Sequence, residues 1–444
     1  MEIRQCAEPD STEASTVAFD DVRTPPSPAG PALVTIYGRL GNAAAWAIRD
    51  FLHRSDVPFE WVPLQSDDSA RSTVQVDHLH DARLPVCLFP DGTRMECPTI
   101  RQITEKLGWF RYPSRSEYDL AIYGAGPAGL SAAVYAGADG LSTVLVERLT
   151  VGGQAGSSSK IENYLGFPQG ISGMELAERA REQACKFGVE ILLAREGVRA
   201  ELKPGRGVGV LEDGTRIVAR ATICATGVAY RRLGLPNEEQ LMGSGLYYGA
   251  GASEAPLARG QSVFIVGGGN SAGQAAMHFA PHASRVSMVI RDASLRSTLS
   301  RYLLDRIAAS ANIEVLARTE VTALHGDGAL REISLRDCAT GAERRVATQW
   351  LFVCIGGEPH THWAESIGMD RDEAGYILTG PDLLQDGRCP PRWPLDREPH
   401  FLETSIPGVF AAGDVRHNAV RRCASAVGEG AMAVAFVHRH LDVG

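Results

Sequence analysis

Gly124-Ala125-Gly126-Pro127-Ala128-Gly129 is the stretch that decides the fold, and a related stretch, Gly267-Gly268-Gly269-Asn270-Ser271-Ala272, follows later in the chain. The first comes directly after the largely apolar residues 118–123 and precedes a helical pattern over 130–138. In such a strand–turn–helix unit, the first glycine permits a tight turn, the second lets the backbone approach a pyrophosphate, and the third packs helix on strand. Because strands and helices alternate beyond residue 117, we predict an α/β fold with two Rossmann-like dinucleotide-binding domains.

The residues that follow each fingerprint indicate which dinucleotide binds there. The strand after the first fingerprint ends at Glu147, which is placed to accept a ribose hydroxyl. The strand after the second fingerprint is followed by Arg291 rather than by an acid. An arginine there favours NADPH over NADH, because its guanidinium pairs with the 2′-phosphate, and Arg296 or Arg301 is placed to assist.

The composition restricts the partners and the location. The 444 residues carry a net charge of −9 without a long basic block, so nucleic acid is not an expected partner. The chain contains no run of about 18 apolar residues, so no membrane span is predicted. The start of the chain lacks the apolar core of a signal peptide, and residues 1–30 are expected to form a flexible, proline-containing tail. Nine scattered cysteines fit a reducing compartment, so we expect a cytoplasmic protein.

No metal site is expected from the sequence. The chain contains no C-x-x-C, which removes both a zinc ribbon and a local redox pair. His278 and His282 have a metal-like spacing, but Pro281 should break the helix between them. No cysteine or acid stands near enough in the sequence to complete such a site.

Residues 31–112 form a separate α/β unit whose order of strand, helix, strand, hairpin and helix resembles glutaredoxin. The stretch Leu84-Pro85-Val86 matches the cis-proline segment of that family, so we expect a cis bond before Pro85. In the family's active-site turn, Asn42 and Ala45 occupy the two cysteine positions. Neither residue can form a thiolate, so the resemblance implies a structural or docking role rather than thiol chemistry.

Two further motifs lie beyond residue 117: Ala225-Thr226-Gly227 after one apolar strand and Gly413-Asp414 after another. Together with the fingerprints, they resemble the low-molecular-weight thioredoxin reductases, which are FAD- and NADPH-dependent pyridine nucleotide-disulfide oxidoreductases. The resemblance implies a discontinuous FAD-binding domain over 117–242 and 350–444, with a NAD(P)H-binding domain over 243–349 inserted in it. It also implies that FAD and NADPH are the cofactors and that the protein is a homodimer.

The resemblance assigns candidate cofactor contacts residue by residue. Those for FAD are Gly124, Gly126, Pro127, Ala128, Gly129, Glu147, Arg148, Gly153, Gln154, Asn163, Ala225, Thr226, Gly227, Ile355, Gly356, Gly413, Asp414, Arg422, Cys423 and Ala424. Those for NADPH are Gly267, Gly269, Asn270, Ser271, Ala272 and Arg291. Arg422 stands where the family usually has glutamine, and a cation there would stabilise the anionic reduced flavin.

The chain departs from the family at the redox disulfide. Tyr247-Tyr248-Gly249-Ala250-Gly251-Ala252-Ser253-Glu254 contains no cysteine, although the family's disulfide falls near residues 250–253. We therefore expect an FAD-dependent NAD(P)H oxidoreductase that moves a hydride from NADPH to FAD and then reduces a non-dithiol acceptor: a small molecule, oxygen or a protein. No catalytic residue is certain, and the candidates are Arg422, Cys423 and Glu254. Glu254 would serve as a general acid only if burial raised its pKa.

Three alternative functions remain open. The first is a thioredoxin-disulfide reductase that uses Cys423 or Cys389 as an unusual thiol. The second is electron transfer to an iron–sulfur protein, as in relatives that resemble ferredoxin–NADP reductase. The third is a redox-sensing or scaffold module whose glutaredoxin-like unit binds a partner.

Overall fold

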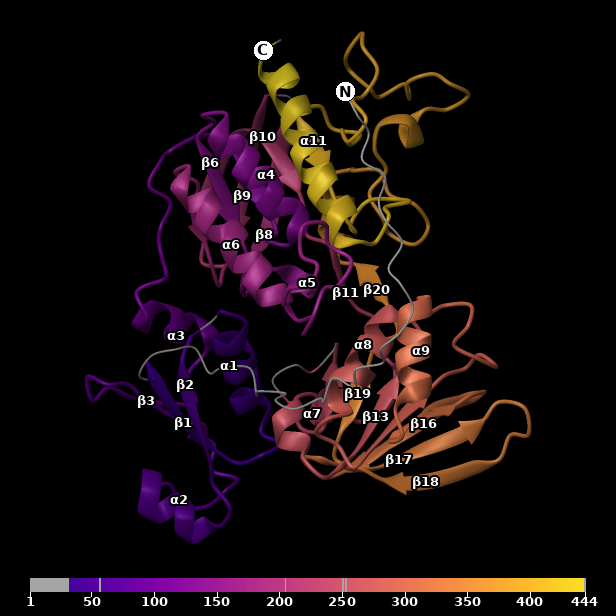
Figure 1. Cartoon of the computed structure of the whole chain (residues 1–444). Coiled ribbons are helices and arrows are strands. Elements are labelled where there is room, and N and C mark those ends of the chain that lie inside the picture. Colours follow the sequence, from indigo (N-terminus) through magenta and orange to yellow (C-terminus); the bar gives the residue numbers. More distant parts are fainter. Residues whose placement is uncertain (1–31, 56, 204, 250, 252–253, 443–444) are drawn as a thin grey trace, which may run out of the picture.

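The computed structural model of the chain consists of three α/β units, one of which is inserted into another (Figure 1). We name them the N-terminal unit (32–112), the first fingerprint unit (117–230 and 357–442) and the second fingerprint unit (231–356). In Figure 1 the first fingerprint unit lies above the other two, which lie side by side.

The structure describes residues 32–442 except 56, 204, 250 and 252–253. The predicted tail over 1–30 therefore lies outside the described residues, as do Ala250, Ala252 and Ser253 of the cysteine-free segment. Among the helices that are described, none combines the length and the apolar character that a bilayer crossing requires.

The N-terminal unit is a four-stranded sheet of order β2-β1-β3-β4 with three helices. Its elements are β1 (Val34–Gly38), α1 (Ala43–Arg54), β2 (Phe59–Pro63), α2 (Asp67–Val74), β3 (Val86–Leu88), β4 (Arg94–Glu96) and α3 (Ile100–Lys106). Asn42 begins α1 as its N-cap, because its side-chain oxygen accepts a hydrogen bond from the Ala45 amide at 2.8 Å. The bond between Leu84 and Pro85 is cis, which confirms the prediction from the sequence.

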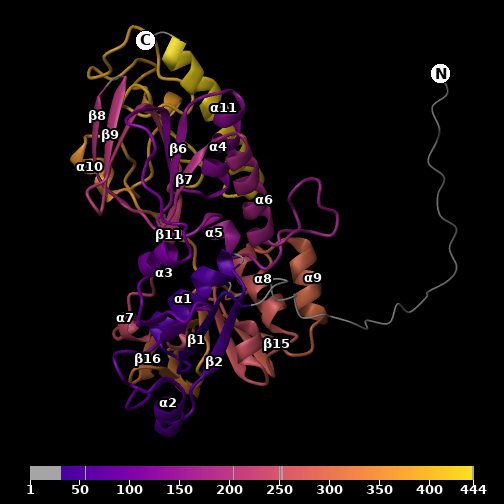
Figure 2. The same cartoon turned by 90° about the vertical axis from the view of Figure 1, so that its left-hand side faces the viewer.

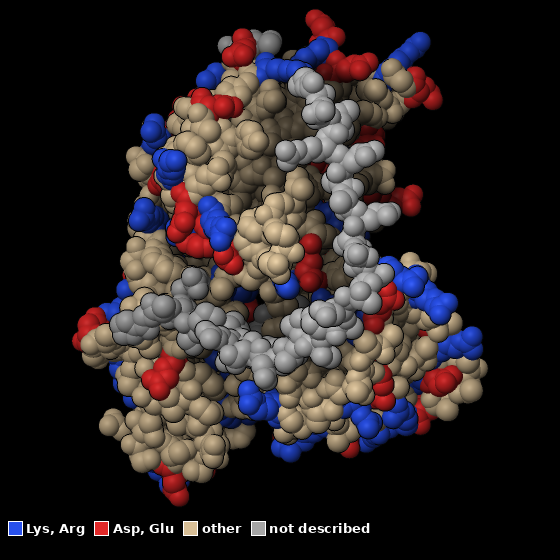
Figure 3. Space-filling model, in the orientation of Figure 1, with Lys and Arg blue, Asp and Glu red and all other residues tan. Residues whose placement is uncertain are grey.

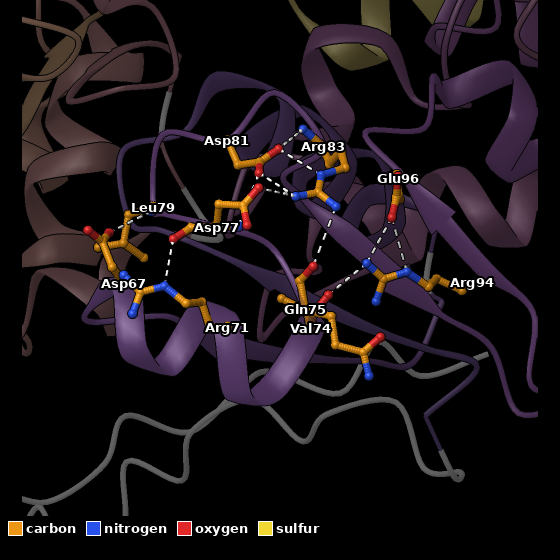
Figure 4. Close-up of polar contacts among 10 residues, drawn as sticks. All are labelled: Asp67, Arg71, Val74, Gln75, Asp77, Leu79, Asp81, Arg83, Arg94 and Glu96. Atoms are coloured by element: carbon orange, nitrogen blue, oxygen red, sulfur yellow. Dashed lines mark hydrogen bonds and ion pairs between the residues drawn. The ribbon is translucent and has the colours of Figure 1, made fainter.

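A network of charged side chains holds the loop between α2 and β3 (Figure 4). The Arg83 guanidinium donates to Asp81 at 2.7 Å and to Asp77 at 3.0 Å, and Arg94 donates to the Val74 carbonyl at 2.7 Å. Exposed ion pairs each add little stability. The network therefore determines the course of the loop more than it strengthens the unit.

The first fingerprint unit is built on a seven-stranded sheet of order β7-β6-β5-β10-β9-β8, with β21 paired to β10. Its elements are β5 (Tyr118–Tyr123), α4 (Pro127–Ala138), β6 (Thr143–Val146), α5 (Gly153–Gly156), α6 (Gly173–Lys186), β7 (Glu190–Leu192), β8 (Gly197–Lys203), β9 (Arg206–Leu211), β10 (Arg216–Cys224), α10 (His362–Ser366), a 3₁₀ turn (Gly380–Leu383), β21 (Val409–Ala411) and α11 (Cys423–Asp442). The core is formed where α4 and α11 pack on this sheet, around Leu120, Ile122 and Phe410. Strand β5 is central and parallel to both neighbours, so its carboxyl end, which carries the first fingerprint, opens at one edge.

The second fingerprint unit has a parallel five-stranded sheet of order β12-β19-β13-β14-β15 and an antiparallel sheet β16-β17-β18. Its elements are α7 (Glu238–Leu241), β12 (Leu246–Tyr248), a 3₁₀ turn (Ala255–Ala258), β13 (Ser262–Val266), α8 (Asn270–Phe279), β14 (Arg285–Val289), α9 (Arg301–Ala309), β15 (Ile313–Leu316), β16 (Thr319–Gly326), β17 (Leu330–Asp337), β18 (Glu343–Ala347) and β19 (Leu351–Val353).

The chain returns from the second unit later than the sequence predicted. We expected the return at residue 350, but β19 lies between β12 and β13 and is fully buried. The crossing comes instead at β20 (Gly357–Pro359), which pairs with β11 (Val228–Tyr230) in a two-stranded link between the units. The physical reason is that a parallel sheet buries both faces of a central strand, so residues 351–353 contribute to the second core.

Candidate functional site

A cavity of about 1140 Å³ lies where the three units meet. Both glycine fingerprints line it, and so do Trp46, Asp50, His53 and Arg54 of helix α1. Figure 2 shows α1 and α3 of the N-terminal unit directly below α5 and β11, and Figure 3 shows the molecule hollowed between its upper and lower parts. The contribution of α1 was not foreseen from the sequence.

The first fingerprint has the backbone geometry that its glycines predicted. Gly124 has a φ of +103°, and a Cβ built on Gly129 would lie 1.8 Å from the Gly124 carbonyl oxygen. Helix α4 begins after Gly126 without a side-chain cap, and Pro127 and Ala128 of its first turn line the cavity. Gly153 lies alongside, since a Cβ built on it would be 3.1 Å from the Gly126 Cα. These two glycines and the helix N-terminus form a cradle that fits a dinucleotide pyrophosphate.

Glu147 directly follows β6 and lines the cavity near this cradle. Its Oε2 accepts a hydrogen bond from the Ala125 amide at 2.7 Å, and its Oε1 accepts one from the Leu149 amide at 2.9 Å. The carboxylate is therefore held in the cavity wall beside Arg148, in the position from which a ribose could be bound. That contact stays a prediction.

The Gly413-Asp414 turn is fixed by helix α11. The Gly413 amide donates to Glu429 Oε2 at 2.7 Å, and Arg416 pairs with the same carboxylate at 2.9 Å. Burial raises the pKa of Asp414, whose side chain lines the cavity. Sequence reasoning missed Glu429 and Arg416, because nothing local marks an acid on α11 as the partner of a turn.

The second fingerprint opens on the same cavity. Gly269 precedes α8 as its N-cap, and a Cβ built there would meet no atom within 4 Å. The Asn270 side chain accepts a hydrogen bond from the Ser300 amide at 2.8 Å, and Thr298 Oγ1 donates to the Gly268 carbonyl at 2.6 Å. Thr298 therefore brings a further loop to the fingerprint.

Among the residues that the structure describes, three cysteines line the cavity, and none of these three is prepared for thiolate chemistry. Burial raises the pKa of Cys224 and Cys354 to about 12. Burial, followed by the charge of Asp414, also raises the pKa of Cys423. Since the thiolate is the reactive form of cysteine, these groups are protonated at neutral pH. Cys389, considered from the sequence, lies outside the lining.

The predicted site residues divide into two groups. The cavity is lined by Gly124, Gly126, Pro127, Ala128, Glu147, Arg148, Gly153, Gln154, Ala225, Thr226, Gly227, Glu254, Gly269, Asn270, Ser271, Gly356, Gly413, Asp414, Arg422 and Cys423. Outside the lining are Gly129, Asn163, Gly267, Ala272, Arg291, Ile355 and Ala424. Gly129 and Ala272 are buried behind their turns, whereas Asn163 and Arg291 are exposed.

Glu254 lines the cavity, but its carboxylate has a protein partner. Its Oε1 lies 3.4 Å from Arg49 Nη2 of α1, and both side chains are buried. This contact favours a role in holding α1. The general-acid role considered from the sequence stays a hypothesis.

Most of the chain is similar in sequence to proteins of a known family. The sequence model of the pyridine nucleotide-disulphide oxidoreductase family matches residues 118–430. Thioredoxin reductase from Bacillus subtilis (strain 168) is 34% identical over 327 residues, which cover 73% of this chain and 95% of the relative. The enzyme of the same name from Mycolicibacterium smegmatis is 33% identical, with 74% and 98% covered.

Solved structures agree with this match. Lactococcus lactis thioredoxin reductase in its FR conformation superimposes with a TM-score of 0.65 at 28% identity, covering 74% of this chain and all of the other. The thioredoxin reductase family uses FAD and NADPH, and both glycine fingerprints of this chain line the cavity. The chain therefore belongs to the pyridine nucleotide-disulphide oxidoreductase family, and it is an FAD-dependent oxidoreductase similar to thioredoxin reductases.

Proposed function

We propose that this protein oxidises NADPH and reduces an acceptor A without using an enzyme disulfide. For a two-electron acceptor, NADPH + H⁺ + A gives NADP⁺ + AH₂; for a one-electron protein acceptor, NADPH + 2 A(oxidised) gives NADP⁺ + H⁺ + 2 A(reduced). The observation that carries the proposal is the segment from Tyr247 to Glu254, whose described residues border the cavity and whose sequence holds no cysteine. Bound FAD would supply the hydride acceptor and the electron donor for this exchange.

The protein's own groups would bind and orient the two dinucleotides. The amides at the start of α4 would hold the FAD pyrophosphate, Glu147 its adenosine ribose and Asp414 its ribitol. Arg422 lines the cavity just before α11, where a cation would favour an anionic reduced flavin. Helix α8 and Arg291 would bind NADPH in the same manner.

The acceptor is tested most directly by anaerobic stopped-flow reduction of the flavin with NADPH, followed by mixing with oxygen, a water-soluble benzoquinone, ferredoxin or oxidised thioredoxin. We expect rapid reduction by NADPH and rapid reoxidation by at least one acceptor other than thioredoxin. Fast reoxidation by oxidised thioredoxin would refute the proposal.

Cys423→Ser is expected to keep NADPH–benzoquinone turnover within about twofold of the wild type, since burial keeps this thiol protonated. Turnover is followed by NADPH absorbance before and after iodoacetamide treatment, with flavin content measured in parallel. Cys185→Ser on α6, an exposed site, is the matched control. A loss above tenfold in Cys423→Ser alone, with FAD retained, would restore the thiol mechanism.

We further propose that residues 31–112 are a glutaredoxin-like unit without redox chemistry. The sheet order β2-β1-β3-β4, with β1 parallel to β2 and antiparallel to β3, supports this interpretation. The later return of the chain at β20 changes the predicted domain limits. These were 117–242 with 350–444 for the FAD-binding domain and 243–349 for the NADPH-binding domain. By analogy with its relatives, the protein is proposed to be a cytoplasmic homodimer.

A further inference from the structure

We propose that the N-terminal unit is a permanent wall of the cavity. In this proposal, helix α1 stays docked on both fingerprint units throughout turnover, so the acceptor is a small molecule that enters the cavity and not a folded protein that docks over residues 247–254. The inference rests on the function proposed above and specifies its class of acceptor.

Helix α1 covers both ends of the cysteine-free segment. Arg49 is 5% exposed and its Nη2 lies 3.4 Å from Oε1 of Glu254, which is 2% exposed. The Trp46 ring contacts the Tyr247 ring, with centroids 5.8 Å apart. Tyr247 is only 3% exposed, so a protein approaching from outside would meet α1 before it met Tyr247 or Glu254.

The same helix also contacts the first fingerprint unit. Arg54 Nη2 donates to the Gly153 carbonyl at 2.9 Å, and Ser55 Oγ donates to Thr150 Oγ1 at 3.0 Å. Gly153 belongs to the glycine cradle beside Gly126. From Trp46 to Arg54, a little over two helical turns therefore join both units across the cavity.

A second anchor fixes the chain where it leaves the N-terminal unit. Arg195 of the first fingerprint unit is 1% exposed, and its Nη2 donates to the Arg111 carbonyl at 2.7 Å. Its guanidinium also lies 4.1 Å from the Phe110 ring and pairs with Asp213 at 2.9 Å. The connection after α3 is therefore bound to the protein surface, so it cannot act as a free tether.

These anchors restrict motion of the second fingerprint unit. The two fingerprint units are joined by β11 and β20, and bending at this link would have to break the contacts of α1 with one unit or the other. A buried ion pair that loses one partner leaves an uncompensated charge, which opposes such opening. Trp46, Asp50 and His53 of α1 themselves line the cavity, so a small molecule bound there would contact α1 in its docked position.

A disulfide lock tests whether the unit stays docked. A Cβ built on Gly41 would lie 3.4 Å from the Ala329 Cβ of the second fingerprint unit, close to the separation of about 3.5–4.5 Å found in disulfides. Neither residue lines the cavity. In Gly41→Cys/Ala329→Cys, oxidation should link the two units, as detected by mass spectrometry of the joined peptides. Because Gly41 has a φ of +76°, the single variants are needed as controls for strain.

We expect the linked holoenzyme to reduce a water-soluble benzoquinone with a kcat/KM within about twofold of the same protein after reduction and desalting. A loss above tenfold that is recovered on reduction would overturn the proposal, as would failure of the link to form in a protein that retains FAD. Failure of the proposed function would look different, because NADPH would then fail to reduce the flavin in every form, linked or not.

Amide hydrogen exchange of the wild-type holoenzyme gives a second measurement that needs no variant. The amides of α1 should remain equally protected in the oxidised enzyme, after NADPH reduction and during turnover with benzoquinone. Loss of that protection during turnover would show that the unit leaves its place, and would refute the inference even if the double variant did not fold.

Discussion

A Gly126→Ala protein should fold normally yet purify with little or no flavin. A Cβ on Gly126 would meet only the Gly153 Cα, at 4.0 Å, so the protein itself tolerates the methyl group. That methyl would stand where α4 begins, in the path of the pyrophosphate. We expect FAD affinity to fall at least tenfold, which is about 1.4 kcal/mol. Flavin absorbance per chain and FAD titration of the apoprotein measure the effect.

Two other glycines control this experiment. Gly428 on α11 is equally open, because a Cβ there meets nothing within 4 Å, and it does not line the cavity. Gly428→Ala should keep its flavin and gain up to about 1 kcal/mol of stability, as expected for alanine in a helix. Gly269→Ala should keep FAD but bind NADPH weakly. Normal FAD affinity in Gly126→Ala would show that the pyrophosphate lies elsewhere.

Arg291→Ala should weaken NADPH binding by about ten- to a hundredfold, equivalent to about 1.4–2.8 kcal/mol, and leave NADH almost unchanged. The residue lies two positions beyond β14, at the carboxyl edge of the parallel sheet, and is exposed. Only NADPH carries the 2′-phosphate that a guanidinium would pair with at this edge. The measurement is KM for each coenzyme with benzoquinone as acceptor.

The matched control is Arg285→Ala, at the opposite end of the same strand. Arg285 is 64% exposed at its side chain and lies 3.9 Å from Glu314, so its removal changes the charge equally without touching the carboxyl edge. It should alter neither KM. Equal losses for NADPH and NADH in Arg291→Ala would mean that this arginine does not contact the phosphate.

The sequence allowed prediction of those parts of the fold that depend on neighbouring residues. The strand, glycine turn, helix and Glu147 of the first fingerprint stand within one short stretch, and each has a local physical reason. The cis bond at Pro85 was predicted from a similar local match. The return of the chain was misplaced, because β19 lies between β12 and β13 only through pairing with distant residues.

The site was less predictable than the fold for the same reason. Arg49 and Glu254 are 205 positions apart, and no sequence pattern near either residue indicates that the two form an ion pair. The sequence showed that cysteine is absent from positions 42 and 45, on one surface, and from residues 247–254, on another. It did not indicate that these two surfaces face each other, because docking depends on the complementary shape of units that fold separately.

The contact between helix α1 and Tyr247 predicts which residues relatives carry at position 247. Trp46 of α1 contacts one side of the Tyr247 ring, which also stacks on Trp350 and Phe352 of its own unit. In a relative without the N-terminal unit, the side that faces Trp46 would lack this contact. We expect relatives that lack the N-terminal unit to carry a hydrophilic residue at position 247, and relatives that possess the unit to keep an aromatic residue there. An aromatic residue at position 247 and the N-terminal unit should therefore occur together across the family.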